Sequence, residues 1–429
     1  MKKLAKLVKE LEKDLLICVK CGTCQATCPL FNITRLEGDV ARGKLALLDG
    51  LIKTVFSNPD KVNEKIFNCL LCGSCAKSCP SNVSIILIFI KARAILTEYS
   101  KLSLPKKFIF RFLISKPERF NKLIYYFEKF QFLFFKEDKN NQKTSSLRIM
   151  PWFVQDRCFK KLAKIPFNKI QYNKGENFKK SKYKVTLFPG CAIDKIFPLI
   201  ALDCVKVLNH YDIDVFIPKD LGCCGIPALA SGDRKTFNTL LTHNIDMLSC
   251  QESDFLITPC ATCLSTIKHL WTDLSKDLDH EEKVFLNRLS AKSLDISQFL
   301  VNVLNVPDII KGKTRENISY HDPCHHKQIL NIVDEPRQLI KISGQRVVEM
   351  EKADSCCGMG GTFNLSHYNE SMKIGELKAE RIIKTKCSIV ATSCPACMIQ
   401  LSDILCKKNS SIDIKHPIEI YKQALLGGK

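Results

Sequence analysis

The second half of this 429-residue chain contains one cysteine pattern twice, and this repeat constrains the fold more than any other feature of the sequence. Each copy has a lone cysteine, then a Cys-Cys-Gly triplet, then a Cys-x2-Cys pair. The lone cysteines are Cys191 and Cys324, and corresponding cysteines of the two copies lie 133 or 134 residues apart. Both copies also place 31 residues between the lone cysteine and the adjacent pair. The repeated spacing indicates an internal duplication, so both copies should adopt the same fold.

Each cysteine site in the two copies follows a short apolar run that is typical of a β-strand. These runs are KVTLFPG, DVFIPKDLG and DFLITP in the first copy and NISYHDP, RVVEM and SIVATS in the second. Helix-like stretches such as FPLIALDCVKVLNHY follow them. The alternation predicts an α/β fold with mostly parallel sheets. Because ligands gather at the carboxyl ends of parallel strands, all five cysteines of a copy are expected to converge there.

Eight further cysteines form two runs near the N-terminus. Each run reads Cys-x2-Cys-x2-Cys-x3-Cys-Pro, starting at Cys18 and at Cys69. This spacing resembles the run of bacterial ferredoxins with two [4Fe-4S] clusters, in which the fourth cysteine of each run ligates the other cluster. The expected ligands are Cys18, Cys21, Cys24 and Cys79 for one cluster and Cys69, Cys72, Cys75 and Cys28 for the other. Two zinc sites are the alternative, but zinc usually draws its thiolates from separated Cys-x2-Cys pairs.

Composition and motifs divide the chain into four regions. Residues 1–100 form a helical ferredoxin-like domain, residues 101–184 a basic aromatic helical connector, and residues 185–300 and 301–429 the two cysteine-rich copies. The connector holds 22 Lys or Arg against 6 Asp or Glu, together with 18 of the 36 aromatic residues. It therefore supplies most of the formal charge of +21, and the nearly neutral remainder argues against nucleic-acid binding. The connector either lies on an anionic membrane surface, packs against a partner subunit, or exposes its basic faces to solvent.

The N-terminal residues read as a short amphipathic helix without the apolar core of a signal peptide. No apolar run is long enough to span a bilayer. We therefore expect a cytoplasmic protein, with a peripheral position on the inner face of the cytoplasmic membrane as an open alternative. In a reducing compartment, clustered cysteines point to metal or redox chemistry rather than to disulfides. Five cysteines outside the motifs are predicted to be core or surface thiols: Cys158, Cys204, Cys250, Cys387 and Cys406.

The Cys-Cys-Gly repeat resembles the cysteine-rich CCG domain of heterodisulfide reductases and of the iron–sulfur subunits of glycolate oxidase, lactate utilisation and anaerobic glycerol-3-phosphate dehydrogenase systems. The resemblance covers residues 185–429, and the ferredoxin-type runs extend it to nearly the whole chain. It implies that the five cysteines of each copy form one ligand set. These sets are Cys191, Cys223, Cys224, Cys260 and Cys263 in the first copy and Cys324, Cys356, Cys357, Cys394 and Cys397 in the second.

In heterodisulfide reductases such five-cysteine sets bind a non-cubane [4Fe-4S] cluster. The resemblance therefore implies two cubane clusters in the N-terminal domain and one or two further clusters, of cubane or non-cubane type, in the CCG copies. Within the family one copy can instead carry zinc or be vacant, and zinc stays an alternative for the first copy. A cysteine-rich apolar core is the competing explanation, and the repeated spacing disfavours it.

Four residues beside the motifs are further candidates. His321 and His325 flank Cys324 and either tune a cluster or only satisfy hydrogen bonds. Arg42 and Lys44 follow the first ferredoxin-type run, as a similar basic turn does in the family. A structural role is at least as well supported for them.

The chain has no dinucleotide-binding fingerprint and no Walker motif, so we expect neither flavin nor NAD on it. Oxidation of a 2-hydroxy acid is a two-electron reaction normally given to flavin, which implies a separate FAD-containing dehydrogenase subunit as partner. The leading hypothesis is a non-catalytic electron-transfer subunit of a glycolate or D-lactate dehydrogenase complex that passes electrons toward quinone. The alternatives are the iron–sulfur subunit of an anaerobic glycerol-3-phosphate dehydrogenase and a heterodisulfide-reductase-like protein that reduces a disulfide at a CCG cluster. Catalytic residues are unknown.

Overall fold

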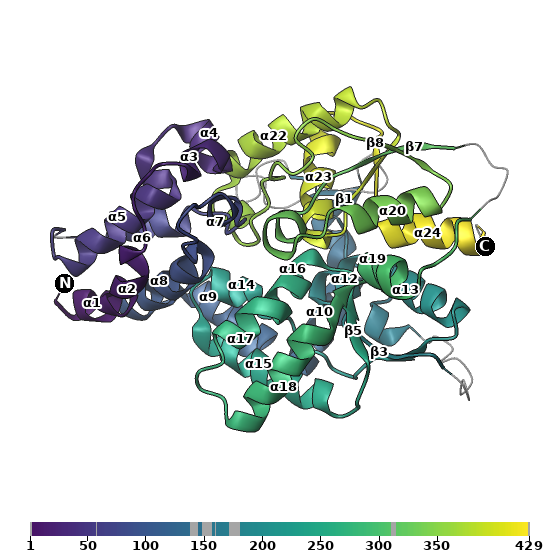
Figure 1. Ribbon diagram of the computed structural model, residues 1–429, viewed down its shortest axis with the longest axis horizontal. Helices are drawn as coiled ribbons and strands as arrows, with labels where there is room; N and C mark the ends of the chain where they lie inside the picture. The colour runs from purple at the N-terminus through teal and green to yellow at the C-terminus, as the bar shows by residue number, and fades with distance from the viewer. Residues whose placement is uncertain are drawn as a thin grey trace.

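The computed structural model of the chain describes residues 2–56, 58–137, 145–147, 157–158, 160–170, 181–309 and 315–427. Figure 1 shows a helical N-terminal region beside two α/β units, each built on one four-stranded sheet. Every strand pairing in these two sheets is parallel. This confirms the predicted α/β fold with parallel sheets and an N-terminal helical domain.

The two sheets have the same topology, as a duplication requires. The first has the order β4-β3-β5-β6 and the second, read in the matching direction, β8-β7-β9-β10. The first sheet consists of β3 (Lys184–Leu187), β4 (Asp214–Phe216), β5 (Phe255–Thr258) and β6 (Ser293–Asp295). The second consists of β7 (Asn317–Tyr320), β8 (Arg346–Val348), β9 (Ile389–Ala391) and β10 (Asp413–Lys415). The first three strands of each sheet lie in the predicted apolar runs, whereas the three-residue strands β6 and β10 were not predicted.

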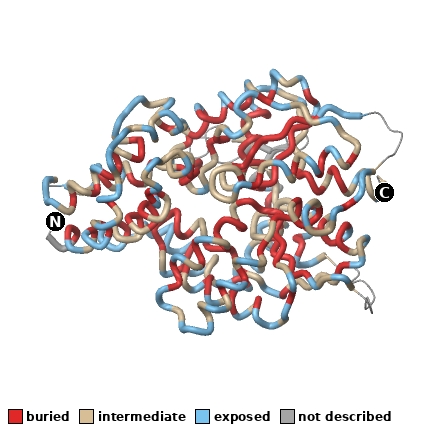
Figure 2. The backbone as a smooth tube through the Cα atoms, viewed as in Figure 1, coloured by how far each residue is buried: buried red, intermediate tan, exposed pale blue. Residues whose placement is uncertain are grey.

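The central strands are buried, and the helices around them supply the core of each unit (Figure 2). The two units also share a core, because the C-terminal helix α24 (Pro417–Leu426) packs against α13 (Pro198–His210) of the first unit and α20 (Asp334–Ile342) of the second. The hydroxyl groups of Tyr211 and Tyr421 form a 2.5 Å hydrogen bond across this contact. The two copies therefore pack against each other and do not form separate, non-contacting domains.

The N-terminal region is an all-helical layer. Its main helices are α1 (Lys2–Val8), α2 (Glu12–Leu16), α5 (Ala41–Ile52), α6 (Asp60–Phe67) and α8 (Ile85–Ser100). Leu4 and Val8 of α1 are fully buried in the same apolar cluster as Leu48 of α5 and Phe89 of α8. This packing uses one face of the predicted amphipathic N-terminal helix and forms the scaffold for the cysteine runs.

The described part of the basic connector is largely helical, with α9 (Leu104–Phe108), a π-helical turn (Ile109–Ile114) and α10 (Pro117–Phe134). Large parts of its sequence, including residues 138–144 and 171–180, lie outside the described residues. Among the helices that the structure describes, none combines the length and the apolar character needed to cross a bilayer.

Cys158 and Cys406 form a disulfide, so the prediction of thiols at these two positions was wrong. The backbone N–H of Cys158 donates a 2.8 Å hydrogen bond to Asp403 Oδ1, and the guanidinium of Arg157 lies 3.9 Å from the ring centroid of Tyr368. These contacts fasten a short piece of the connector to α23 (Pro395–Lys407) and α22 (Tyr368–Lys384). The two cysteines are 248 residues apart, and only this docking brings them together.

His416, the N-cap of α24, is fully buried between the two units. Its Nδ1 accepts a 3.2 Å hydrogen bond from the backbone N–H of Ile418, which requires an unprotonated Nδ1. Burial lowers the pKa of His416 from 6.5 to about 4. Protonation of this ring therefore opposes folding.

This pKa shift predicts a defined acid sensitivity. As pH falls below the ordinary value of 6.5, the unfolded chain takes up a proton at His416 before the folded chain does. We expect the titration of His416 to lower the free energy of unfolding by about 1 kcal/mol when the pH falls from about 7.5 to about 5.5. His416→Asn keeps an N-cap acceptor and removes the titration. Anaerobic denaturant unfolding at both pH values should show a smaller pH effect in the variant, and equal effects in variant and parent would contradict the assignment.

Candidate metal centres

Two small cavities enclose the eight N-terminal cysteines in two groups of four. Cys18, Cys21, Cys24 and Cys79 line one cavity, and Cys28, Cys69, Cys72 and Cys75 line the other. Each cavity therefore takes three thiols from one run and the fourth from the other run, which is the grouping expected from the sequence. Four thiols around an enclosed space are the donor set of a [4Fe-4S] cubane.

Two short helices produce this exchange of ligands. In each run the third cysteine lies at the start of one helical turn, α3 (Cys24–Thr27) or α7 (Ser74–Lys77), which carries the chain toward the other cavity. The two turns touch, and the hydroxyl groups of Thr27 and Ser78 lie 3.1 Å apart. After the first turn, Pro29 begins a new helix, where its missing N–H costs nothing. The proline after Cys28 therefore helps to end the first helical turn at Cys28 and to begin the next helix.

The second cavity is the more buried of the two and has buried cations beside it. Burial raises the pKa of the Cys28 and Cys72 thiols to about 12, so a metal must displace their protons on binding. The ammonium of Lys44 is buried and donates to the Asp39 carbonyl oxygen. Arg93 is also buried and donates a 2.7 Å hydrogen bond to the carbonyl oxygen of Cys69. Both cations can offset the negative charge of a thiolate-bound cluster.

The five cysteines of the first CCG copy converge at the carboxyl ends of three strands. Cys191 begins α12 (Cys191–Ile196) after β3, and its Sγ lies 3.6 Å from Sγ of Cys223, which follows β4. The thiol of Cys224 contacts those of Cys223 and Cys263. Cys260 follows β5, and its Sγ accepts a 3.4 Å hydrogen bond from the N–H of Cys263. The structure thus brings all five predicted ligands together at one end of the sheet.

The glycine after each adjacent cysteine pair has a backbone that other residues rarely adopt. Gly225 and Gly358 both have φ +93°. A Cβ on Gly225 would lie 2.6 Å from Cδ2 of Phe237, and one on Gly358 would collide with the carbonyl oxygen of Ser371. Glycine is therefore needed to turn the chain while both neighbouring thiols stay in the site.

The second CCG copy repeats this arrangement. Thiol contacts join Cys324 to Cys356, Cys356 to Cys357, and Cys394 to Cys397, and Sγ of Cys357 lies 3.4 Å from Sγ of Cys397. Hydrogen bonds from Cys356 and Cys397 lower the pKa of Cys357 to about 5. The thiolate form, which is the form that binds metals, is therefore favoured before any metal arrives.

The two CCG sites meet at the interface between the copies. The thiol of Cys260 contacts that of Cys394, and the hydroxyl of Thr262 lies 3.4 Å from Sγ of Cys394. The backbone N–H of Ala261 also donates a 3.1 Å hydrogen bond to the Ser393 carbonyl oxygen. The ten motif cysteines of the duplicated region therefore form one continuous group.

The second CCG site also lies against the N-terminal domain. Cys72 of the second ferredoxin-type site and Cys356 are buried in the same apolar cluster, together with Leu70 and Phe363. The ammonium of Lys77 donates a 2.7 Å hydrogen bond to Oδ1 of Asn331 across this contact. The four cysteine groups consequently form a series, in the order first ferredoxin-type site, second ferredoxin-type site, second CCG site, first CCG site.

A cavity of about 540 Å³ opens at the junction of the three units. All five cysteines of the second CCG copy contribute to its wall: Cys324, Cys356, Cys357, Cys394 and Cys397. Gly73 from the N-terminal domain and His269 from the first copy also line it. This cavity gives a small molecule or a redox partner access to the second CCG site.

Sequence reasoning identified one histidine pair and missed two cations. Nδ1 of His325 lies 3.6 Å from Sγ of Cys324; burial opposes its charge, yet the neighbouring Cys324 raises the pKa of His325 above its ordinary value. Lys378 was missed, although it is fully buried and donates 2.9 Å hydrogen bonds to the carbonyl oxygens of Lys352 and Ala353. Burial lowers the pKa of Lys378 to about 8. Lys378 and Arg93 each lie on the buried, otherwise mostly apolar face of a helix. A single cation at such a position in the sequence could have identified them as candidates.

This fold and these sites define an iron–sulfur protein in which a domain for two clusters precedes a duplicated cysteine-rich α/β domain. Comparison with known families gives the same result. The 4Fe-4S dicluster domain family matches residues 14–83, and the cysteine-rich domain (CCG) family matches residues 185–268 and 318–402. The chain therefore carries one 4Fe-4S dicluster domain and two CCG domains.

Several curated relatives match this chain, two of them over more than 90% of its length. The probable glycolate oxidase iron-sulfur subunit of Bacillus subtilis (strain 168) is 28% identical over 402 residues, which cover 91% of this chain and 89% of the relative. An uncharacterized iron-sulfur protein of Methanococcus maripaludis is 25% identical, and the match covers 94% of this chain and 70% of the relative. Lactate utilization protein A 2 of Bacillus cereus (strain 03BB102) is 28% identical, with 56% of this chain and 99% of the relative covered.

Solved structures also have a similar fold. One of them is a hypothetical protein from Helicobacter pylori, with a TM-score of 0.53 and 12% sequence identity, and the match covers 92% of this chain and 69% of that one. At this identity the likeness concerns the fold alone.

Proposed function

We propose that this chain is the electron-transfer subunit of a flavin-dependent 2-hydroxy-acid dehydrogenase complex that acts on glycolate or D-lactate. It receives electrons from an FAD-containing subunit and passes them toward quinone. The observation that carries the proposal is the uninterrupted series of four cysteine groups, joined by the Cys72–Cys356 packing and the Cys260–Cys394 contact. The names of the relatives from Bacillus support the choice of substrate class.

In this proposal each cysteine group holds one metal centre. The two N-terminal groups each hold a [4Fe-4S] cubane, the second CCG group holds a further cluster, and the first CCG group holds either a cluster or zinc. Clusters of this kind accept and release single electrons, which suits a relay between a two-electron flavin and a quinone. The protein's part is to place the centres in series and to set their potentials through burial, hydrogen bonds and nearby cations.

Metal analysis of the anaerobically purified chain tests the proposal. Three or four clusters correspond to about twelve to sixteen irons per chain, with a similar amount of acid-labile sulfide. We expect Cys357→Ser to lose iron from the second CCG site, and Cys224→Ser to lose iron or zinc from the first. With its flavoprotein partner present, glycolate or D-lactate should bleach the cluster absorbance. Absence of labile sulfide, or bleaching by neither substrate, would contradict the proposal.

The same proposal places the chain in the cytoplasm, at the inner face of the cytoplasmic membrane. Helix α10 supports this position, because Tyr126 and Phe130 expose 59% and 53% of their surface on a helix that also carries basic residues. Such a face suits contact with an anionic lipid surface near the quinone pool.

A second candidate, reduction of a disulfide substrate, is favoured by the cavity of about 540 Å³ beside the second CCG site. Its wall includes the thiols of Cys324 and Cys357, so a bound disulfide would lie next to the metal centre. Disulfide reduction by the isolated reduced chain, with no flavoprotein present, would support this candidate over the first.

A further inference from the structure

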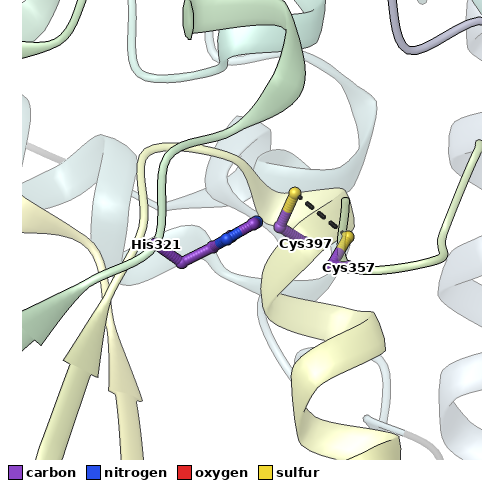
Figure 3. A group of neighbouring side chains, drawn as sticks. All are labelled: His321, Cys357 and Cys397. Atoms are coloured by element: carbon purple, nitrogen blue, oxygen red, sulfur yellow. Dashed lines mark hydrogen bonds between the residues drawn. The ribbon is translucent and has the colours of Figure 1, made fainter. Parts of the chain in front are cut away.

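His321 is a buried histidine with one ring nitrogen that lacks a hydrogen-bond partner. The side chain is 1% exposed, and its Nδ1 lies 3.2 Å from the carbonyl oxygen of Ala353. Its Nε2 is buried and makes no hydrogen bond with the residues that the structure describes. Figure 3 shows the ring directed from the end of β7 toward Cys357 and Cys397.

The chemistry of the Ala353 contact fixes which nitrogen carries the proton. A carbonyl oxygen can only accept, so Nδ1 must donate, and Nε2 of the neutral ring then holds a free lone pair. A ring nitrogen of His321 and the sulfur atoms of Cys357 and Cys397 all lie within 4.8 Å of one another. A buried acceptor without a donor is costly, whereas a metal ion would satisfy it. Metal-binding histidines commonly donate their second N–H to a backbone carbonyl, as this one does.

The two CCG copies differ at this position. All five cysteines are repeated, but the residue 133 positions before His321 is Phe188. Phe188 is fully buried and has no atom that can ligate a metal. Lys378 also lacks a charged counterpart, because the residues 133 and 134 positions earlier are Ile245 and Asn244. The histidine therefore makes the second site chemically distinct from the first.

We propose that Nε2 of His321 is a direct ligand of an iron atom at the second CCG site, beside Cys357 and Cys397, and that the first site has thiolate ligands only. This inference rests on the proposed cluster at the second site. A neutral imidazole leaves less negative charge on a cluster than a thiolate does, and replacement of cysteine by histidine raises the potential of other iron–sulfur clusters. The Lys378 ammonium, which donates to the same Ala353 carbonyl oxygen, acts in the same direction. The neutral imidazole and the nearby ammonium should therefore favour electron uptake at the second CCG site.

Pulsed EPR on the full-length chain tests this ligand directly. The protein is reconstituted anaerobically with iron and sulfide, with and without ¹⁵N-histidine, and compared with His321→Phe, which copies the residue of the first CCG copy. We expect a nitrogen hyperfine coupling that changes with the isotope in the parent and is lost in His321→Phe. His367→Phe is the control, because His367 is a half-buried histidine of the same unit that does not line the cavity, and this variant should keep the coupling.

His321→Cys keeps the test informative if the phenylalanine variant does not fold. We expect this variant to retain its iron, to lose the isotope-sensitive coupling, and to show a lower midpoint potential for one cluster. Full iron and sulfide without any histidine coupling in the parent would overturn the ligand assignment and leave the proposed electron-transfer function intact. Absence of labile sulfide in the parent would instead remove the proposed function itself.

Discussion

We expect Cys79→Ala to empty the same cluster site as Cys18→Ala, although the two positions are 61 residues apart. Both thiols line one small cavity with Cys21 and Cys24, whereas Cys28 lines the other. Each thiolate binds one iron of the cubane, so removal of one thiolate leaves one iron without its protein ligand and should prevent stable binding of the cluster. Each single variant should therefore lack about four irons per chain, measured as iron and labile sulfide after anaerobic reconstitution.

Double variants separate this exchange of ligands from the simpler alternative, in which each run binds its own cluster. If Cys18 and Cys79 serve one cluster, the double alanine variant loses no more than about four irons, because the second substitution acts on a site already empty. Cys79→Ala combined with Cys69→Ala should lose about eight. Cys250→Ala, at an exposed thiol outside the motifs, should lose none. The reverse pattern, with the larger loss in the Cys18 and Cys79 pair, would show that the runs do not exchange ligands.

The local part of this architecture could be predicted from the sequence because short spacings encode it. Each ferredoxin-type run specifies its ligands within a few helical turns and a trailing proline, and the strands before Cys191 and Cys324 are short apolar runs that end shortly before a cysteine. The duplication then required the two sheets to share one strand order, which they do. Strands β6 and β10 escaped prediction because each contains only one apolar residue and ends in a charged one.

The contacts between units could not be predicted, because no local pattern records how folded units dock. Nothing in the spacing of the cysteines requires Cys260 to touch Cys394, Cys72 to share a buried cluster with Cys356, or Cys158 to reach Cys406. Each of these contacts joins different regions of the chain, and it depends on the surfaces that the completed folds present. The order of the four cysteine groups is therefore a property of the tertiary structure.

Arg93 of α8 joins the N-terminal domain to the first CCG unit through backbone carbonyl groups. Its guanidinium donates to the carbonyl oxygens of Ile66, at 3.1 and 3.2 Å, of Phe67 at 3.2 Å, and of Cys69 at 2.7 Å. It also donates a 2.7 Å hydrogen bond to the carbonyl oxygen of Ala230 in the first CCG unit. Burial lowers the pKa of Arg93 to about 10, opposed by the nearby Cys69 thiol. The side chain therefore holds the loop that begins the second cysteine run against both α8 and the first CCG unit.

We expect Arg93→Ala to destabilise the chain by about 3–5 kcal/mol, because it leaves several buried carbonyl groups without a donor and removes the cation beside the second ferredoxin-type site. Arg93→Lys should fall between alanine and the parent, since an ammonium keeps the charge but cannot reach all the carbonyls in the planar geometry of a guanidinium. Anaerobic denaturant unfolding measures the stability, and iron content after reconstitution reports the second cluster.

Arg35→Met provides the matched control, because Arg35 lies in the same domain but is exposed, and its substitution should change stability by at most about 0.5 kcal/mol. Loss of stability and loss of iron should both follow from displacement of one loop, since one carbonyl that Arg93 binds belongs to the predicted ligand Cys69. Arg93→Ala should therefore lose iron under conditions in which the chain is still folded. A variant that is destabilised yet keeps its full iron would show that Arg93 fastens the units together without positioning the cluster.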